Sequence, residues 1–213
     1  MEIHKLQSEI QGKILVRAEE ILKSGGVVVV PTDTVYGLVC DATNAAAMKK
    51  IFAIKRRSAK KSLLLFVRDI AMARRFAYIS DKKVKFLERV WPGATTVVFD
   101  HKEKLSKIVT GGKDSLGFRI PDHEFLQALL VRINVPLAQT SANISGDAPL
   151  ESFDEIKKQF SAVKIKPDAI IDAGRILGKP SMILDYTGND LVVIRMGVMS
   201  KAQFDKLLLF VKR

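Results

Sequence analysis

Four consecutive valines, residues 27–30, constrain this chain more than any other feature. Two glycines precede the run and Pro31 ends it. An uninterrupted β-branched run of this length predicts a strand that is buried on both faces. Thr32, Asp33 and Thr34 follow at once, and open α/β sheets place ligands where buried strands end. An ordinary Pro-Thr-Asp turn would explain the same residues, so the rest of the chain has to decide.

The overall composition predicts a single globular domain over residues 1–213. The chain is 47% hydrophobic and 27% charged, as is usual for soluble domains of this size. No apolar run approaches the length needed to span a bilayer, and no secretory signal is visible. We therefore expect a cytoplasmic protein without membrane association. Cys40 is the only cysteine and there are three histidines, which excludes an internal disulfide and argues against a structural zinc site.

The charge is strongly basic, since 35 Lys and Arg oppose 23 Asp and Glu to give a net charge of +12. Such an excess predicts attraction to polyanions such as nucleotides, pyrophosphate or RNA. It does not choose among them, and several basic pairs are equally well explained as solvated helix faces.

Apolar periodicity and capping residues predict alternating helices and strands. Helices are expected over residues 8–22, 45–55, 70–76, 81–91, 124–132, 153–160 and from 201 to the terminal Lys212-Arg213. Strands are expected over residues 27–30, 63–67, 94–99, 116–120, 136–139, 169–172, 182–185 and 191–195, with a loop over 101–115. The last two strands should form a hairpin. The alternation predicts an α/β fold with one mixed sheet.

The candidate functional residues share one property, which is that they stand where an apolar strand or helix ends. Hydroxyls, an amide and cations at element ends can converge on one crevice, and such a set suits an anionic ligand with several phosphates. For a single Lys or Arg, an ordinary surface charge is the alternative, and for the hydroxyls and the amide it is a turn or a helix cap. The set comprises Thr32, Thr34, Lys55, Arg57, Arg119, Ser141, Asn143, Ser181 and Arg195.

Several common catalytic motifs are missing from the sequence. The nearest approach to a phosphate-binding P-loop is Gly111-Gly112-Lys113-Asp114, where an aspartate replaces the required Ser or Thr. The sequence has neither a GxGxxG fingerprint nor a GxSxG nucleophile elbow. A hydrolase triad or a zinc enzyme is poorly supported, whereas an unusual nucleotide site remains possible.

Taken together, seven motifs resemble those of the YrdC-like family, the threonylcarbamoyl-AMP synthases of tRNA modification. The resemblance covers about residues 8–200. The motifs follow the family's order and are PTDTVYGL (31–38), Lys55-x-Arg57, WPGATTVVF (91–99), GFRIPDH (117–123), TSANISG (140–146), Pro180-Ser181 and Arg195-x-Gly197.

This resemblance implies a twisted mixed sheet flanked by helices, with a basic concave face. It implies that L-threonine and bicarbonate form a carbamate, which attacks the α-phosphate of ATP to give threonylcarbamoyl-AMP and pyrophosphate. A downstream threonylcarbamoyl transferase would then modify a tRNA adenosine next to the anticodon. Mg²⁺ is expected to enter with ATP, without a dedicated protein metal site.

The family pattern also implies roles for individual residues. Lys55 and Arg57 would be the catalytic pair at the ATP phosphates, and Arg119 would pair the carboxylate of threonine. The ATP-binding set would be Lys55, Arg57, Ser115, Ser141, Asn143 and Arg195, and the threonine-binding set would be Thr34, Lys61, Arg119 and Ser181, with Lys61 and Ser115 the weaker candidates.

The chain departs from the family pattern at three positions. Ser58 stands where the family has Pro, and Ser62 stands where the family has Pro or Gly. Both changes predict a looser loop after Arg57. Met196 replaces a glutamate after Arg195. Two other functions remain open. One is a non-catalytic module that binds RNA or tRNA on the basic face, and the other is a carbamoyl-transfer domain of the kind found in larger chains.

Overall fold

The valine run lies at the centre of one half of the sheet. In the computed structural model, which describes residues 1–7 and 11–211, Val28–Val30 form the strand β2, and Val27–Val30 are completely buried. β2 pairs in parallel with β8 (Ala169–Asp172) and antiparallel with β3 (Gly37–Asp41). A strand with neighbours on both edges and side chains buried on both faces is what an unbroken valine run predicts.

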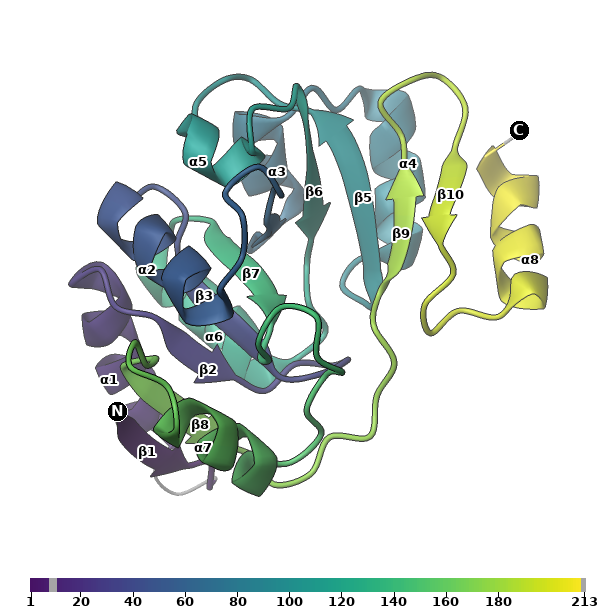
Figure 1. Cartoon of the computed structure of the whole chain (residues 1–213). Helices are drawn as coiled ribbons and strands as arrows, with labels where there is room; N and C mark the ends of the chain where they lie inside the picture. Colours follow the sequence, from purple (N-terminus) through teal and green to yellow (C-terminus); the bar gives the residue numbers. More distant parts are fainter. Residues whose placement is uncertain (8–10, 212–213) are drawn as a thin grey trace.

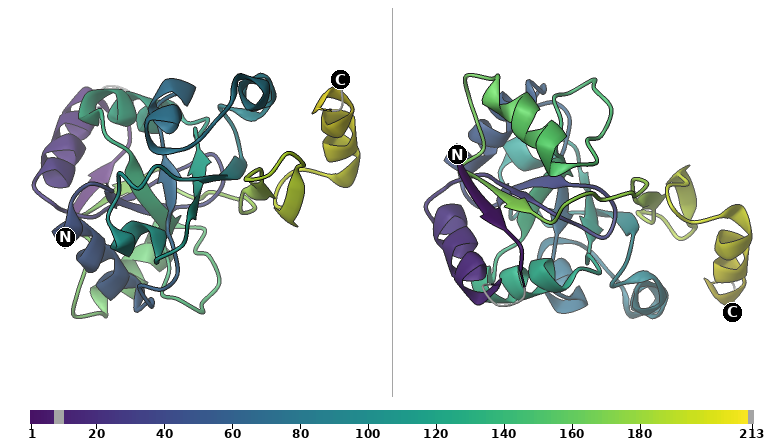
Figure 2. Two further views of the ribbon diagram at one scale, coloured as in Figure 1. Left: turned by 90° about the horizontal axis from the view of Figure 1, so that it is seen from above. Right: turned by 90° about the horizontal axis from the view of Figure 1, so that it is seen from below.

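Successive valines pack into two different hydrophobic cores, because side chains alternate across a strand. Val28 and Val30 pack with the helices α1 (Gln11–Lys23) and α6 (Glu124–Ile133). Val27 and Val29 belong to the larger core, which includes residues of α2 (Ala45–Lys55) and α7 (Phe153–Ser161). Figure 2 shows α1 and α6 on one side of the sheet and α2 and α7 on the other.

Ten strands form one mixed sheet within the described residues, in the order β1-β8-β2-β3-β7-β4-β6-β5-β9-β10. The strands not yet introduced are β1 (Glu2–Lys5), β4 (Leu64–Phe66), β5 (Thr95–Asp100), β6 (Ser115–Arg119), β7 (Leu137–Ser141), β9 (Met182–Asp185) and β10 (Val192–Arg195). The β9–β10 pair is antiparallel, which confirms the predicted hairpin. Figure 1 shows this hairpin and the final helix at one end of the molecule, away from β1.

The remaining helices cover the other half of the sheet and its end. They are α3 (Ile70–Phe76), α4 (Asp81–Val90), the short α5 (Lys107–Thr110) and α8 (Lys201–Val211). Residues of α3 and α4 join Val97 and Phe99 of β5 in the larger core. On the same strand, Thr96 and Val98 face a cavity instead, so this part of the sheet has one covered face and one hollowed face.

Most predicted elements are confirmed, and so are several of their capping hydrogen bonds, although Ser80 before α4 makes none with its side chain. Asn44 caps α2 through its side chain, and Ser152 forms a capping box with Glu155 at the start of α7. Ser200 and Gln203 exchange the same pair of hydrogen bonds before α8. The predicted first turn of α1 at residues 8–10 and the predicted end of α8 at Lys212-Arg213 lie outside the described residues.

Four predictions about elements were wrong in detail. β1 was not predicted, since it is a short edge strand with alternating exposure and little apolar content. β3 was not predicted as a strand, and it begins at Gly37 within the motif that follows Pro31. The predicted loop over 101–115 contains α5, and Ser115 already belongs to β6. β7 continues through Ser141, whereas the sequence placed its end at Gln139.

In the part of the chain that the structure describes, no helix has both the length and the apolar character required to cross a bilayer.

Candidate active site

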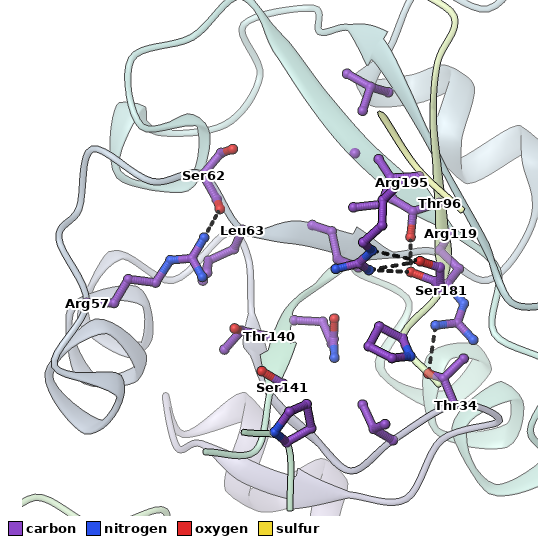
Figure 3. Close-up of a pocket in the computed structure, with 18 residues that line it drawn as sticks. Thr34, Arg57, Ser62, Leu63, Thr96, Arg119, Thr140, Ser141, Ser181 and Arg195 are labelled. Carbon is purple, nitrogen blue, oxygen red and sulfur yellow. Dashed lines mark hydrogen bonds between the residues drawn. The ribbon is translucent and has the colours of Figure 1, made fainter. Parts of the chain in front are cut away.

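A cavity of about 340 Å³ lies against the middle strands of the sheet (Figure 3). Its floor is formed by β4, β5, β6 and β7, and one side is closed by the turn after β2 and by the segment that leads into β9. Six of the predicted site residues line it, namely Thr34, Arg57, Arg119, Ser141, Ser181 and Arg195. Thr34 and Arg195, which are 161 positions apart in the chain, thus meet at one place.

Thr34 is held in its turn by the side-chain hydroxyl of Thr32. The Thr32 hydroxyl oxygen accepts hydrogen bonds from the main-chain nitrogens of Thr34 at 3.0 Å and Val35 at 3.2 Å. The same hydroxyl donates to the carbonyl oxygen of Val35 at 2.7 Å. This is the Ser/Thr side-chain turn that competes with regular structure. It fixes the Thr34 hydroxyl, which is 2.9 Å from that of Thr32, at the edge of the cavity.

Arg119 is the most enclosed guanidinium of the site, with 2% of its surface exposed. Its Nε donates to the carbonyl oxygen of Gly93 at 2.9 Å, and its Nη1 donates to the Thr34 hydroxyl at 3.1 Å. Its Nη2 donates to the Asp33 carboxylate at 2.5 Å. Burial lowers the pKa of Arg119, and the Asp33 charge opposes that shift. The arginine is therefore held rigidly by three segments of the chain.

Ser181 and Arg195 form the neighbouring part of the site. The Ser181 hydroxyl lies 2.9 Å from the Thr96 hydroxyl, and both side chains are buried. Arg195 donates from Nε at 3.1 Å and from Nη2 at 2.9 Å to the carbonyl oxygen of Ser181. Gly197 allows this close approach, because a Cβ there would lie 2.5 Å from the same oxygen. Burial lowers the pKa of Arg195.

Lys55 lies behind the cavity rather than in its lining. As predicted from the buried stripe of α2, it is enclosed, with 2% exposed. Its Nζ donates to the main-chain oxygen of Ser141 at 2.8 Å and to Asn143 Oδ1 at 2.6 Å. The Ser141 hydroxyl donates to the same amide oxygen at 2.6 Å. Burial, with a further effect of the Arg57 charge, lowers the pKa of Lys55 to about 8. Lys55 and Asn143 thus support Ser141 from below.

Arg57 enters the cavity from the side opposite Arg119 and Arg195 (Figure 3). Its Nη2 donates to the carbonyl oxygen of Ser62 at 2.9 Å. Its Nε is buried and has no partner among the described residues. Burial lowers the pKa of Arg57. A buried donor without a partner is costly, and it makes Arg57 a group that an incoming acceptor can satisfy.

The net charge of the cavity is positive. The lining contains three arginines, Arg57, Arg119 and Arg195. Of these three, only Arg119 forms an ion pair within the described residues, and its partner is Asp33. Two guanidinium groups without a carboxylate partner favour an anionic ligand, and they can bind phosphate or carboxylate with two parallel hydrogen bonds.

Thr32, Lys55 and Asn143 are buried behind the lining of the cavity, and two further predicted residues are not part of the site. Lys61 is exposed, and Ser115 begins β6 at the end of the strand that is remote from Arg119; neither lines the cavity. The structure also adds four polar lining residues that were not among the predicted site residues, namely Ser62, Thr96, Gln139 and Thr140. For Thr96 and Gln139, a polar side chain within an otherwise apolar strand was the signal that could have found them.

An open mixed sheet with a central arginine-rich cavity defines an α/β protein suited to an anionic ligand, and comparisons with known proteins narrow this class. The family model Sua5/YciO/YrdC, described as "Telomere recombination", matches residues 20–197. A Methanocaldococcus jannaschii protein with the provisional name threonylcarbamoyl-AMP synthase is 36% identical over 200 residues, which is 93% of each chain. The chain belongs to the Sua5/YciO/YrdC family.

Solved structures agree with this assignment. P. abyssi Sua5, solved in complex with L-threonine, superposes with a TM-score of 0.87 at 30% identity. The superposition covers 97% of this chain and 60% of the P. abyssi chain, so this chain spans three fifths of that relative. E. coli YciO superposes with a TM-score of 0.83 at 26% identity, over 95% and 98% of the two chains. The predicted α/β fold is confirmed.

Proposed function

We propose that the protein is a threonylcarbamoyl-AMP synthase that acts in tRNA modification. L-threonine and bicarbonate would form a carbamate, the carbamate would attack the α-phosphate of ATP, and pyrophosphate would leave. A downstream threonylcarbamoyl transferase would use the product on tRNA. Support comes from family membership, from the name of the M. jannaschii relative and from the threonine complex of P. abyssi Sua5.

The observation that carries the proposal is the arrangement of two different sets of groups across one cavity. Arg57 and Ser141 lie on one side and suit the phosphates of ATP. Thr34, Arg119 and Ser181 lie on the other and suit an amino acid, with Arg119 for its carboxylate. The two substrates would therefore meet over the strands between them.

The proposed reaction requires no protein nucleophile, which fits the residues present. Positioning and charge stabilisation are the two contributions the chain can make. Arg57 would neutralise charge at the phosphates. Lys55 would keep Ser141 and Asn143 in place through its hydrogen bonds to both residues. Arg195 would add positive charge from the opposite side.

We propose that Mg²⁺ enters with ATP and is held mainly by phosphate oxygens and water. The polar side chains of the cavity are hydroxyls, guanidiniums and the amide of Gln139, and Asp33 is paired with Arg119. In the described part of the chain, no group of three or more His, Cys, Asp or Glu is placed to hold a metal. This donor set fits a metal carried by the nucleotide, which would neutralise phosphate charge.

Pyrophosphate release from ATP tests the proposal. We expect release only when L-threonine, bicarbonate and Mg²⁺ are all supplied, and omission of any one should reduce the rate to background. ATP that remains intact under complete conditions would contradict the proposal.

Two substitutions test the placement of the site in the same assay. Arg57→Ala and Asn143→Ala should abolish turnover while circular dichroism shows a folded chain. Lys85→Ala, on the exposed face of α4, is the matched control and should keep full activity. If Arg57→Ala turns over at the normal rate, the assignment of the phosphate side is wrong.

The RNA-binding module is not favoured by the comparisons, which lead to a named synthase and to a threonine complex. It predicts tight RNA binding that weakens steeply with salt, together with no use of ATP.

A further inference from the structure

Asp33 belongs to the turn after β2 and forms an ion pair with Arg119, the most enclosed arginine of the site. Its Oδ1 accepts from Arg119 Nη2 at 2.5 Å, and the side chains are 13% and 3% exposed. We propose that Asp33 is a positioning residue, which holds Arg119 so that the guanidinium presents its free N–H groups to the carboxylate of the amino-acid substrate. The inference deepens the proposed function and rests on it.

The hydrogen bonds of Arg119 leave some of its N–H groups without an acceptor. A guanidinium carries N–H groups on each of its nitrogens, one on Nε and two on each Nη. Gly93 takes the Nε hydrogen, Thr34 takes one from Nη1 and Asp33 takes one from Nη2. One N–H on each terminal nitrogen remains without an acceptor among the described residues, and a substrate carboxylate can accept hydrogen bonds from such groups.

The position of Asp33 argues against direct contact with substrate. Thr34 and Arg119 both line the cavity, whereas Asp33 is absent from its lining. Its carboxylate lies beyond the guanidinium, so any effect on bound substrate has to pass through Arg119. Asp33 is therefore not a candidate for a general base in the cavity.

Charge explains why this position needs a carboxylate. A guanidinium that is almost completely buried requires a compensating negative charge. Asp33 opposes the effect of burial on Arg119, whereas the charge of Arg195 adds to it. Asp33 thus compensates the buried charge of Arg119 and orients the guanidinium before the substrate arrives, so the arginine does not have to reorganise on binding.

A double-mutant cycle separates this role from a merely structural one. The variants are Asp33→Ala, Arg119→Gln and the double variant, with KM for L-threonine and for ATP read from pyrophosphate release. Asp33→Ala should raise the threonine KM by about tenfold or more, as expected when a hydrogen bond to a charged group loses its geometry. The ATP KM should change less than about twofold by the same reasoning. In the Arg119→Gln background, removal of Asp33 should have no further effect on the threonine KM.

Conservative variants and direct binding complete the test. Asp33→Asn keeps an acceptor oxygen and should recover part of the lost threonine affinity, which covers the case in which Asp33→Ala fails to fold. Asp122→Asn removes an exposed acidic charge from the same region and should leave both KM values unchanged. Calorimetric titration of the wild type and Asp33→Asn with L-threonine alone needs no turnover. It therefore tests the effect of Asp33 on threonine affinity even if the synthase assay fails.

The proposal is overturned if Asp33→Ala and Asp33→Asn bind threonine as tightly as the wild type. It is also overturned if both KM values rise together, or if Asp33→Ala is as harmful with Gln at position 119 as with Arg.

Discussion

Two cations are buried in this molecule to the same extent, and they differ in what surrounds them. Lys55 and Arg119 each have 2% of their surface exposed. Arg119 faces a carboxylate, so its charge is compensated. Lys55 donates hydrogen bonds to the neutral oxygens of Ser141 and Asn143. Its pKa falls to about 8 because of burial and of the nearby Arg57 charge, and the charge of Asp147 opposes that shift only in part.

The lowered pKa of Lys55 predicts a pH-dependent stability. Below pH 8 both the folded and the unfolded states carry the proton, and the penalty for burying the charge is fully present. Between pH 8 and 10.5 only the unfolded state keeps it, so stability rises with pH in this window. Relative to Lys55→Met, the free energy of unfolding of the wild type should increase by about 3 kcal/mol across the window, measured by urea denaturation. A constant difference between the two proteins would contradict the prediction.

The sequence predicted which residue types would gather, but not how they would be arranged. The burial of Lys55 followed from the apolar stripe of α2. That Lys55 would sit behind Ser141, and that Asp33 would pair with a residue 86 positions away, depended on contacts between elements that no local pattern encodes. Lys61 and Ser115 came only from the family resemblance, without a local signal of their own.

At the scale of elements, the turn after β2 depends on a second segment packed directly against it. Gly178 lies so close to the main chain of Thr34 that a Cβ at position 178 would be 1.6 Å from the carbonyl oxygen of Thr34. The segment that carries Ser181 into the site can therefore run past the turn only with glycine at this position.

Gly178→Ala should consequently push the two segments apart. We expect a higher KM for L-threonine and a lower melting temperature, because Thr34 and Ser181 would both move. Gly188→Ala is the matched control, since nothing lies within 4 Å of its Cβ position. Melting curves and threonine titrations that are the same for both variants would show that the two segments are not tightly coupled.

Elements with a strong periodic signal were predicted correctly, whereas two short elements, β1 and α5, were missed. The valine strand, α2 and the capped α7 have apolar spacing and terminal residues that agree. β1 has four residues at a sheet edge, and α5 has four residues inside a polar stretch. In such short elements, tertiary contacts rather than local preference decide the backbone.

At the scale of the whole molecule, the site results from the strand order. β7, β4, β6, β5 and β9 are adjacent in the sheet although they are far from consecutive in the chain. This order places Ser141, Arg119, Thr96 and Ser181 on neighbouring strands or at their ends. Sequence alone predicted a mixed sheet but gave no basis for this order, because non-local pairing leaves no periodic trace.

The cavity is also the place where helices stop covering the sheet. On β5, Val97 and Phe99 join the core while Thr96 and Val98 face open space. A strand that is apolar on one face and lines a hollow on the other can supply rigid floor positions for bound substrates. We propose that ATP and the threonine carbamate meet on this floor.

Identification of the product tests directly whether these two substrates react with each other. The protein is incubated with ATP, Mg²⁺, L-threonine and ¹³C-bicarbonate, and the products are separated and analysed by mass spectrometry. We predict one species that contains the adenylate, the threonine and a single ¹³C atom, formed in the same amount as pyrophosphate. If AMP or ADP appears without labelled carbon joined to threonine, the proposed reaction is wrong.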